Sequence, residues 1–150
     1  MPEQENTTYV AVVDRDGNVA SFLNSLRNPF GSGLVAGDTG ILLQNRGKDF
    51  SLDPNSVNRL EPRKRTMHTL NPAMLFKDGA PYMTLGCVGG HQQTQGLQQF
   101  LVNHLNHGYE IQQAIEAPRW ALSGDGKLHI EPALAHAKSC LLYTSPSPRD

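Results

Sequence analysis

The stretch from Thr7 to Leu26, TTYVAVVDRDGNVASFLNSL, decides the fold that we expect for this chain. β-Branched and aromatic residues dominate its first half, and residues 19–26 form a second run of the same kind. Between the two runs, Asp16-Gly17-Asn18 is a strong turn signal, because glycine adopts a positive φ without steric cost. The pattern predicts an antiparallel β-hairpin.

Two further hairpins are predicted downstream. Ala73–Phe76 and Pro81–Leu85 flank a turn at Lys77–Ala80. A glycine-containing turn at Gly124–Gly126 precedes a short strand at Lys127–Ile130. Since each pair is joined by a short loop, we expect antiparallel pairing in both.

Helical periodicity lies between these last two hairpins. A helix is predicted from about Gln92 to His107, ended by Gly108 at the position where helices favour glycine. A second, shorter helix is expected at Glu110–Ala117. Both show an apolar face at helical spacing, which we expect to be buried; the residues on these faces are Leu97, Phe100, Leu101, Leu105, Ile111, Ala114 and Ile115.

Strands thus come first, then two helices, then strands again. Together with a short buried strand expected at Thr39–Gln44, this order predicts an α+β domain with antiparallel sheets and helices packed on one face. No alternation of strand and helix supports a parallel, doubly wound sheet.

Composition excludes several functions. The chain has 150 residues, enough for one ordinary domain, and 13 Lys and Arg against 14 Asp and Glu give a net charge of −1. That balance argues against a nucleic-acid partner or an anionic membrane surface. No apolar run is long enough for a transmembrane helix, and the start, MPEQENTT, has no secretory pattern. Cys87, Cys140 and the six histidines lack metal-ligand spacing, so neither metal nor cofactor is expected.

The last segment, residues 140–150, departs from everything before it. Its sequence, CLLYTSPSPRD, carries Pro146 and Pro148, which oppose helix. The string resembles the in-frame translation of a sequencing-library adapter. We therefore expect a non-native tail on a truncated gene, with an ordinary disordered terminus as the alternative.

Two features suggest acyl-transfer chemistry. Thr7 opens a strand, and Gly89 and Gly90 stand at the start of a helix. Backbone N–H groups there can stabilise developing negative charge, and a hydroxyl nearby can act as nucleophile. The plainer alternative is that Thr7 only reflects β-propensity.

Short motifs strengthen this hypothesis, because they follow one another in a consistent order from Thr7 to about Ile130. In that order they resemble the small-subunit, C-terminal half of the gamma-glutamyltransferase family of N-terminal-nucleophile hydrolases. The matching stretches are Thr7-Thr8-Tyr9, Val12-Val13-Asp14-Arg15-Asp16-Gly17-Asn18, Phe30-Gly31-Ser32-Gly33, Gly40-Ile41-Leu42-Leu43-Gln44-Asn45, Asp49-Phe50-Ser51, Lys64-Arg65, Asn71-Pro72, Lys77-Asp78-Gly79, Gly89-Gly90 and Ala117-Pro118-Arg119.

The resemblance implies a fold and a mechanism. The fold would be part of a four-layer αββα sandwich, with residues 1–6 as leader and 7–139 as the small-subunit domain. The precursor would cut itself before Thr7, whose hydroxyl would attack an amide carbonyl while its freed α-amine acts as base. Gly89 and Gly90 match the oxyanion hole, and Ser25 matches a residue that hydrogen-bonds the nucleophile.

The implied substrate site departs from the family pattern. Asp49 matches the carboxylate that binds a glutamyl α-ammonium. Arg27 and Arg46 replace two acceptor side chains, and His68-Thr69 replaces a serine pair that holds the substrate carboxylate. A fork of two arginines would favour a glutaryl group over a γ-glutamyl group. The alternative is that the arginines point outward or pair with Asp49.

The resemblance also implies partners. A large subunit cut from the same precursor would supply half of the sandwich, so this chain alone would be inactive. The substrate would be a small amide carrying a γ-glutamyl or glutaryl group. Alternatives are a cephalosporin acylase-like enzyme and a catalytically silent family member. The sequence does not indicate a compartment.

Overall fold

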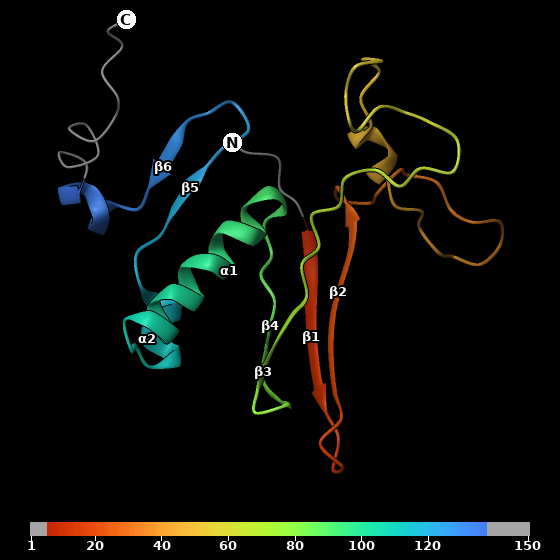
Figure 1. Ribbon diagram of the computed structural model, residues 1–150. Coiled ribbons are helices and arrows are strands. Elements are labelled where there is room, and N and C mark those ends of the chain that lie inside the picture. The colour runs from red at the N-terminus through yellow and green to blue at the C-terminus, as the bar shows by residue number, and fades with distance from the viewer. Residues whose placement is uncertain (1–5, 138–150) are drawn as a thin grey trace, which may run out of the picture. The chain divides into compact units, whose positions relative to one another are not determined.

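The computed structural model describes residues 6–137, and the chain divides near residue 94 into two compact units (Figure 1). The expectation of a non-native tail at residues 140–150 lies outside the described residues, as do residues 1–5 of the expected leader. Within the described residues, helices occur with three two-stranded antiparallel sheets, which confirms the predicted α+β class with antiparallel sheets.

The first hairpin forms where the sequence predicts it. Strands β1 (Asn6–Val13) and β2 (Val19–Arg27) pair antiparallel. The Asp14 carboxylate orders the turn between them, because its Oδ1 accepts backbone N–H bonds from Asp16 (2.9 Å) and Asn18 (2.8 Å). Such local capping of backbone donors is a regular use of Asp in turns.

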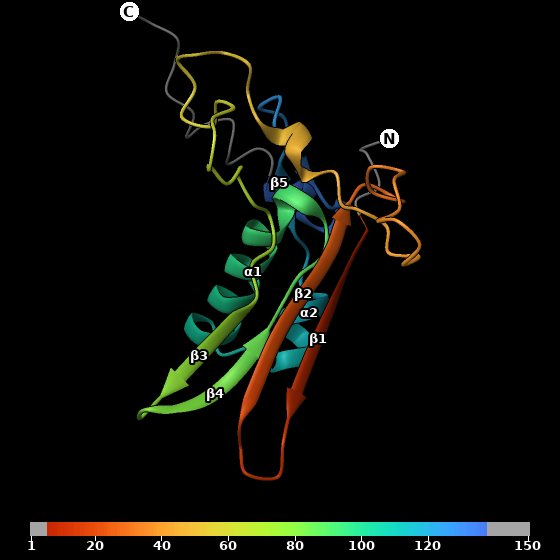
Figure 2. The ribbon, with the colours of Figure 1, turned by 90° about the vertical axis from the view of Figure 1, so that its right-hand side faces the viewer.

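The second hairpin, β3 (Ala73–Lys77) and β4 (Ala80–Leu85), lies beside the first in the same unit, with β4 against β2 (Figure 2). The Tyr9 hydroxyl joins the two hairpins through hydrogen bonds to Thr84 Oγ1 (2.9 Å) and Ser21 Oγ (3.1 Å). The Tyr9 ring also occupies the space beside Gly86, where an added Cβ would lie only 2.2 Å from it.

The predicted buried strand at Thr39–Gln44 is wrong. Only Leu42 makes a β-bridge, with Val35, and Ile41 is exposed. The left-handed backbone at Gly37 and Gly40 (φ 53° and 72°) turns the chain on either side of Asp38-Thr39, so no extended run forms there.

Paired amides close the base of this loop. The Asn28 backbone N–H donates to Asn45 Oδ1 (3.2 Å), and Asn45 Nδ2 donates to Asn28 Oδ1 (3.1 Å). A short 3₁₀ helix, Arg46–Asp49, follows at once. The loop therefore returns the chain to the end of β2.

The predicted helices form with small changes. A 3₁₀ turn (Gly90–Gln92) leads into α1 (Gln93–Leu101), which continues as a π-helical turn at Val102–Asn106. Helix α2 spans Ile111–Glu116 and begins at a capping box made by Glu110.

The expected burial of the apolar helix faces is largely wrong. Leu105, Ile111 and Ile115 are exposed, Ala114 is buried, and Leu97, Phe100 and Leu101 are half-buried. Within the described residues the buried hydrophobic side chains are few: Leu23, Leu85 and Ala114. An apolar face at helical spacing is buried only when another element covers it, and none in the described part of the chain covers the exposed positions.

The third hairpin, β5 (Trp120–Leu122) and β6 (Leu128–Ile130), is confirmed in the second unit. Two glutamines of α1 bind its first strand as a neighbouring strand would. Gln99 exchanges two hydrogen bonds with the backbone of Trp120 (2.9 and 3.0 Å). Gln95 does the same with Leu122 (3.0 and 2.7 Å).

A final 3₁₀ segment spans Pro132–Ala137. Across residues 6–137, no helix combines the length and the apolar character that crossing a membrane requires.

Candidate active site

Thr7 and Ser25 face each other across the first hairpin. The register pairs Thr7 with Ser25, whereas Asn6 pairs with Arg27, so Leu26 is an extra residue opposite the Asn6–Thr7 bond. Such a β-bulge bends the strand and redirects its side chains, and bulges are common beside active sites. The structure thus places the predicted nucleophile and its predicted hydroxyl partner side by side at an irregular strand end.

Both residues line an open pocket of about 500 Å³. This volume suits a small-molecule ligand. The walls come from both strands of the first hairpin, from the loop after it and from the segment before the glycine pair; they are Thr7, Thr8, Asn24, Ser25, Leu26, Asn28, Pro29, Phe30 and Val88.

The glycine pair follows directly after Val88 of this pocket. Gly89 and Gly90 have left-handed backbone, with φ of 114° and 55°. Gly89 caps the 3₁₀ turn that leads into α1, and its carbonyl accepts the Gln92 N–H (3.0 Å). The first N–H groups of a helical segment lack intrahelical partners, so this turn can offer donors to an oxyanion.

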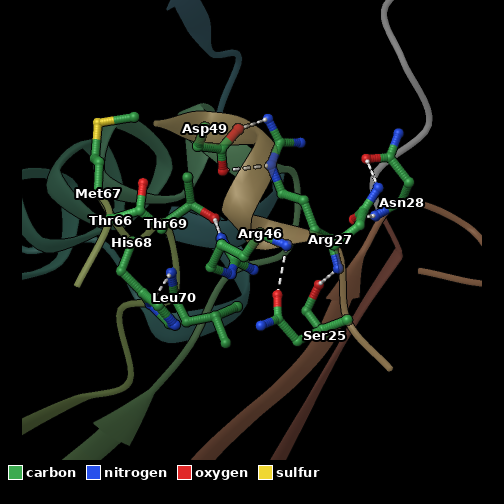
Figure 3. A network of polar contacts seen from close by, with 12 residues as sticks. Ser25, Arg27, Asn28, Arg46, Asp49, Thr66, Met67, His68, Thr69 and Leu70 are labelled. Atoms are coloured by element: carbon green, nitrogen blue, oxygen red, sulfur yellow. Dashed lines mark hydrogen bonds and ion pairs between the residues drawn. The ribbon is translucent and has the colours of Figure 1, made fainter. Parts of the chain in front are cut away.

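Arg27 and Asp49 form a buried ion pair next to Ser25 (Figure 3). Arg27 Nε lies 3.0 Å from Asp49 Oδ2, and Nη2 lies 3.2 Å from Oδ1. The Arg27 N–H donates to Ser25 Oγ (3.0 Å), and its φ of 78° is unusual for a residue with a side chain. Arg27 therefore pairs with Asp49, the alternative expected from the sequence.

Arg46 is buried beside this pair, with 5% of the residue exposed. Its Nη1 donates to Thr69 Oγ1 (2.9 Å), while Nη2 is buried and has no hydrogen-bond partner among the described residues. Burial lowers the pKa of Arg46; Asp49 opposes this shift and Arg27 reinforces it. Asp49 is thus hydrogen-bonded to Arg27 and acts on Arg46 only through its charge.

The two residues of the predicted substrate-binding pair His68-Thr69 lie in different environments. Thr69 is buried against Arg46, whereas His68 is exposed and its Nδ1 accepts the Leu70 N–H (3.2 Å). The structure brings Arg27, Asp49, Arg46 and Thr69 together. None of the four lines the Thr7 pocket, although Arg27 is hydrogen-bonded to Ser25, which does.

Sequence reasoning missed Gln93. Its side chain is fully buried and, with its amide nitrogen facing them, donates to the carbonyls of Thr69 (2.8 Å) and Cys87 (3.1 Å). It thereby ties the polar cluster to the segment before Gly89. Nothing in the polar run HQQTQG marked this glutamine, because its partners lie 6 and 24 residues away in the chain.

No group of three His, Cys, Asp or Glu side chains within residues 6–137 is placed to hold a metal ion.

Solved structures share this fold. A mutant gamma-glutamyltranspeptidase from Helicobacter pylori has a TM-score of 0.80 at 26% identity, covering 92% of this chain and 81% of that one. Cephalosporin acylase from Bacillus halodurans has a TM-score of 0.80 at 41% identity, covering 91% of this chain and 26% of that one. These likenesses confirm the predicted N-terminal-nucleophile hydrolase fold. The family model of gamma-glutamyltranspeptidase matches residues 1–142, and the chain belongs to that family.

Curated relatives agree with this assignment. The glutathione hydrolase-like YwrD proenzyme of Bacillus subtilis is 55% identical over 119 residues, 79% of this chain and 23% of the relative. The oxamate amidohydrolase proenzyme of Klebsiella pneumoniae is 41% identical over 117 residues, 78% of this chain and 22% of the relative. The chain spans less than a quarter of the length of these relatives.

Proposed function

We propose that this chain is the nucleophile-bearing part of a self-processing amidohydrolase or acyltransferase of the gamma-glutamyltranspeptidase family. The observation that carries the proposal is the cross-strand pairing of Thr7 with Ser25 on the wall of one pocket. Val88, which directly precedes the glycine pair, also lines this pocket. In this proposal Thr7 is the nucleophile, Ser25 is its hydroxyl partner and the Gly89-Gly90 turn is the oxyanion site, all within the first unit.

The reaction begins with self-cleavage. Water hydrolyses the bond between Asn6 and Thr7: its hydroxyl completes a carboxyl group on Asn6 and its proton goes to Thr7, which gains a free α-amine. An α-amine has an unperturbed pKa of about 7.7–8.0, close to working pH, so it can accept the proton of its own hydroxyl.

Turnover then proceeds through an acyl-enzyme. Thr7 Oγ bonds to the amide carbonyl, the oxyanion faces the N–H groups of the Gly89-Gly90 turn, and the proton passes through the α-amine to the leaving amine. Water or an amine acceptor releases the acyl group and restores the hydroxyl. The relatives named glutathione hydrolase, oxamate amidohydrolase and acylase support a small amide as substrate, with γ-glutamyl and glutaryl groups as the candidate acyl groups.

The partner in this proposal is the remainder of the same precursor, as a large subunit. Several relatives are named proenzymes, and the chain covers less than a quarter of their length. The first hairpin also exposes an apolar face: Val10 and Phe22 are cross-strand partners, and both are exposed together with Val12. Burying such a face is a main driving force for subunit association.

Processing of the full-length precursor tests the proposal. We expect Thr7→Ala to give one uncut band on a denaturing gel, while wild type gives two chains, the smaller beginning at Thr7 by N-terminal sequencing. Thr8→Ala is the matched control, since it removes the neighbouring hydroxyl and leaves cleavage intact. Cleavage of Thr7→Ala at the same bond would disprove the role of Thr7.

A further inference from the structure

Gln93 is hydrogen-bonded to both ends of the four-residue segment 87–90, which contains the glycine pair. Its side-chain nitrogen donates to the carbonyl of Cys87 (3.1 Å), and its backbone N–H donates to the carbonyl of Gly90. Gln93 is also fully buried, so water does not compete for these bonds. One residue thus limits how far the two ends of the turn can move apart.

A third hydrogen bond fixes the Gln93 side chain itself. The same nitrogen donates to the carbonyl of Thr69 (2.8 Å), on a segment that precedes β3. A primary amide nitrogen carries two hydrogens and can therefore serve two carbonyl oxygens at once, whereas a hydroxyl carries only one. The position of the Cys87 carbonyl is thereby set relative to a buried residue of another segment.

The peptide units that carry the N–H groups of Gly89 and Gly90 are also bonded on their carbonyl sides. Cys87 Sγ donates to the Val88 carbonyl (3.3 Å), and the Gln92 N–H donates to the Gly89 carbonyl (3.0 Å). Because a peptide is planar, a fixed C=O also fixes the direction of the N–H on the same unit. A hydrogen bond to the C=O further polarises that N–H, which strengthens it as a donor.

The turn needs such anchors. Glycine has the freest backbone of all residues, and two of them stand in succession here. Val88, which lines the Thr7 pocket, is 51% exposed, so side-chain packing holds this segment only weakly. The hydrogen bonds of Gln93 are therefore the main restraint on the backbone that enters the glycine pair.

Resting on the proposed amidohydrolase function, we propose that Gln93 is the positioning residue of the oxyanion turn. It keeps the N–H groups of Gly89 and Gly90 directed at the place where the amide oxygen gains negative charge. Preorganised donors of this kind stabilise the transition state more than the bound substrate. Loss of Gln93 therefore lowers kcat and leaves KM nearly unchanged, whichever acyl group the substrate carries.

Steady-state kinetics of the full-length processed enzyme test the proposal, with γ-glutamyl-p-nitroanilide and glutaryl-p-nitroanilide as substrates. Gln93→Met keeps the length of the side chain and removes both donors. For each anilide that wild type hydrolyses, kcat should fall at least tenfold, while KM stays within about threefold. Gln98→Met is the matched control, because Gln98 is an exposed glutamine of α1. A loss confined to KM, or an equal loss in Gln98→Met, would overturn the role of Gln93.

A double-mutant cycle with Gly89→Ala separates positioning of the turn from general damage. Gly89→Ala already displaces the N–H groups, so Gln93→Met added to it should lower kcat by no more than about threefold further. If the two losses multiply instead, Gln93 acts independently of the turn and the proposal is wrong.

Gln93→Glu serves if Gln93→Met is not processed. Burial against two carbonyl oxygens keeps the new carboxyl protonated, so it retains one of the two donors. Its kcat should lie below that of wild type, and it takes the place of Gln93→Met in the cycle. Failure of both variants to process would assign Gln93 to folding of the precursor and overturn its role in the turn.

The outcomes separate this inference from the proposed function. Multiplying losses, or a change in KM alone, in an enzyme whose wild type is processed and active leave the proposed function standing. A wild-type precursor that is not cut, or that hydrolyses neither anilide, overturns the proposed function itself.

Discussion

Arg27 holds both carboxylate oxygens of Asp49, at 3.0 and 3.2 Å, although 22 residues separate them in the chain. The two side chains are only 7% and 9% exposed. Removing one member of such a pair leaves an uncompensated buried charge, which costs more than removing both. The pair therefore fixes the end of β2 to the short helix that carries Arg46.

Arg27→Met should accordingly destabilise the intact protein by about 3–5 kcal/mol, since Asp49 is left buried and unpaired. The double variant Arg27→Met with Asp49→Leu should recover much of that loss. Denaturant unfolding measures both. Arg59→Met is the control, because Arg59 pairs with Glu61 at the surface. Its loss should lower the free energy of unfolding by about 1 kcal/mol or less. A double variant less stable than Arg27→Met alone would contradict this account.

Gly89→Ala should reduce turnover far more than stability. With φ at 114°, an alanine there forces the backbone to shift, and the N–H groups of the turn move with it. Loss of one oxyanion donor lowers kcat by about 10²–10³-fold. Gly33→Ala is the control, since Gly33 also has a positive φ and open space around it but is not part of the turn that leads into α1. Equal kcat losses in the two variants would contradict the assignment.

Gly86→Ala should destabilise the first unit. Its new methyl group would lie 2.2 Å from the Tyr9 ring, so the ring or the hairpin must move. Overpacking of this kind costs about 1–3 kcal/mol. Gly47→Ala, which meets nothing within 4 Å, should leave the melting temperature nearly unchanged. Thermal unfolding of the intact protein compares them, and equal shifts would argue against close packing at Gly86.

Gln99→Leu should loosen the third hairpin. It removes both hydrogen bonds to the backbone of Trp120, and net contributions of about 0.5–1.5 kcal/mol are typical for each bond. Gln98→Leu is the control, because Gln98 is exposed and makes no such contact with β5. Amide hydrogen exchange at Trp120 and Leu122 reports the effect directly. Unchanged protection at Trp120 in Gln99→Leu would show that the glutamine contributes nothing.

Local signals predicted the regular elements well. The Asp16-Gly17-Asn18 turn and the helical repeat before Gly108 each depend on neighbours in the sequence, and both elements form close to the expected bounds. The strand expected at Thr39–Gln44 failed because a strand requires a partner, and the two flanking glycines bend the chain instead.

The site was predictable in part. Residue types and motif order indicated Thr7, Ser25 and the glycine pair, and the first two do line one pocket. Arg27 pairs with Asp49, and Arg46 pairs with Thr69. In each case the two residues are more than twenty positions apart, so the contact depends on how the intervening loop folds. No rule of sequence spacing predicts such a long-range contact. The sequence therefore left open whether the arginines bind the substrate, point outward or pair with Asp49.

The close approach of the Tyr9 ring to Gly86 also constrains how this sequence can vary over evolution. A side chain at position 86 becomes acceptable only after position 9 has lost its aromatic ring. That loss also removes the hydroxyl bonded to Ser21 and Thr84. Substitutions at positions 9 and 86 should therefore appear together among related sequences, with glycine retained wherever the tyrosine is kept.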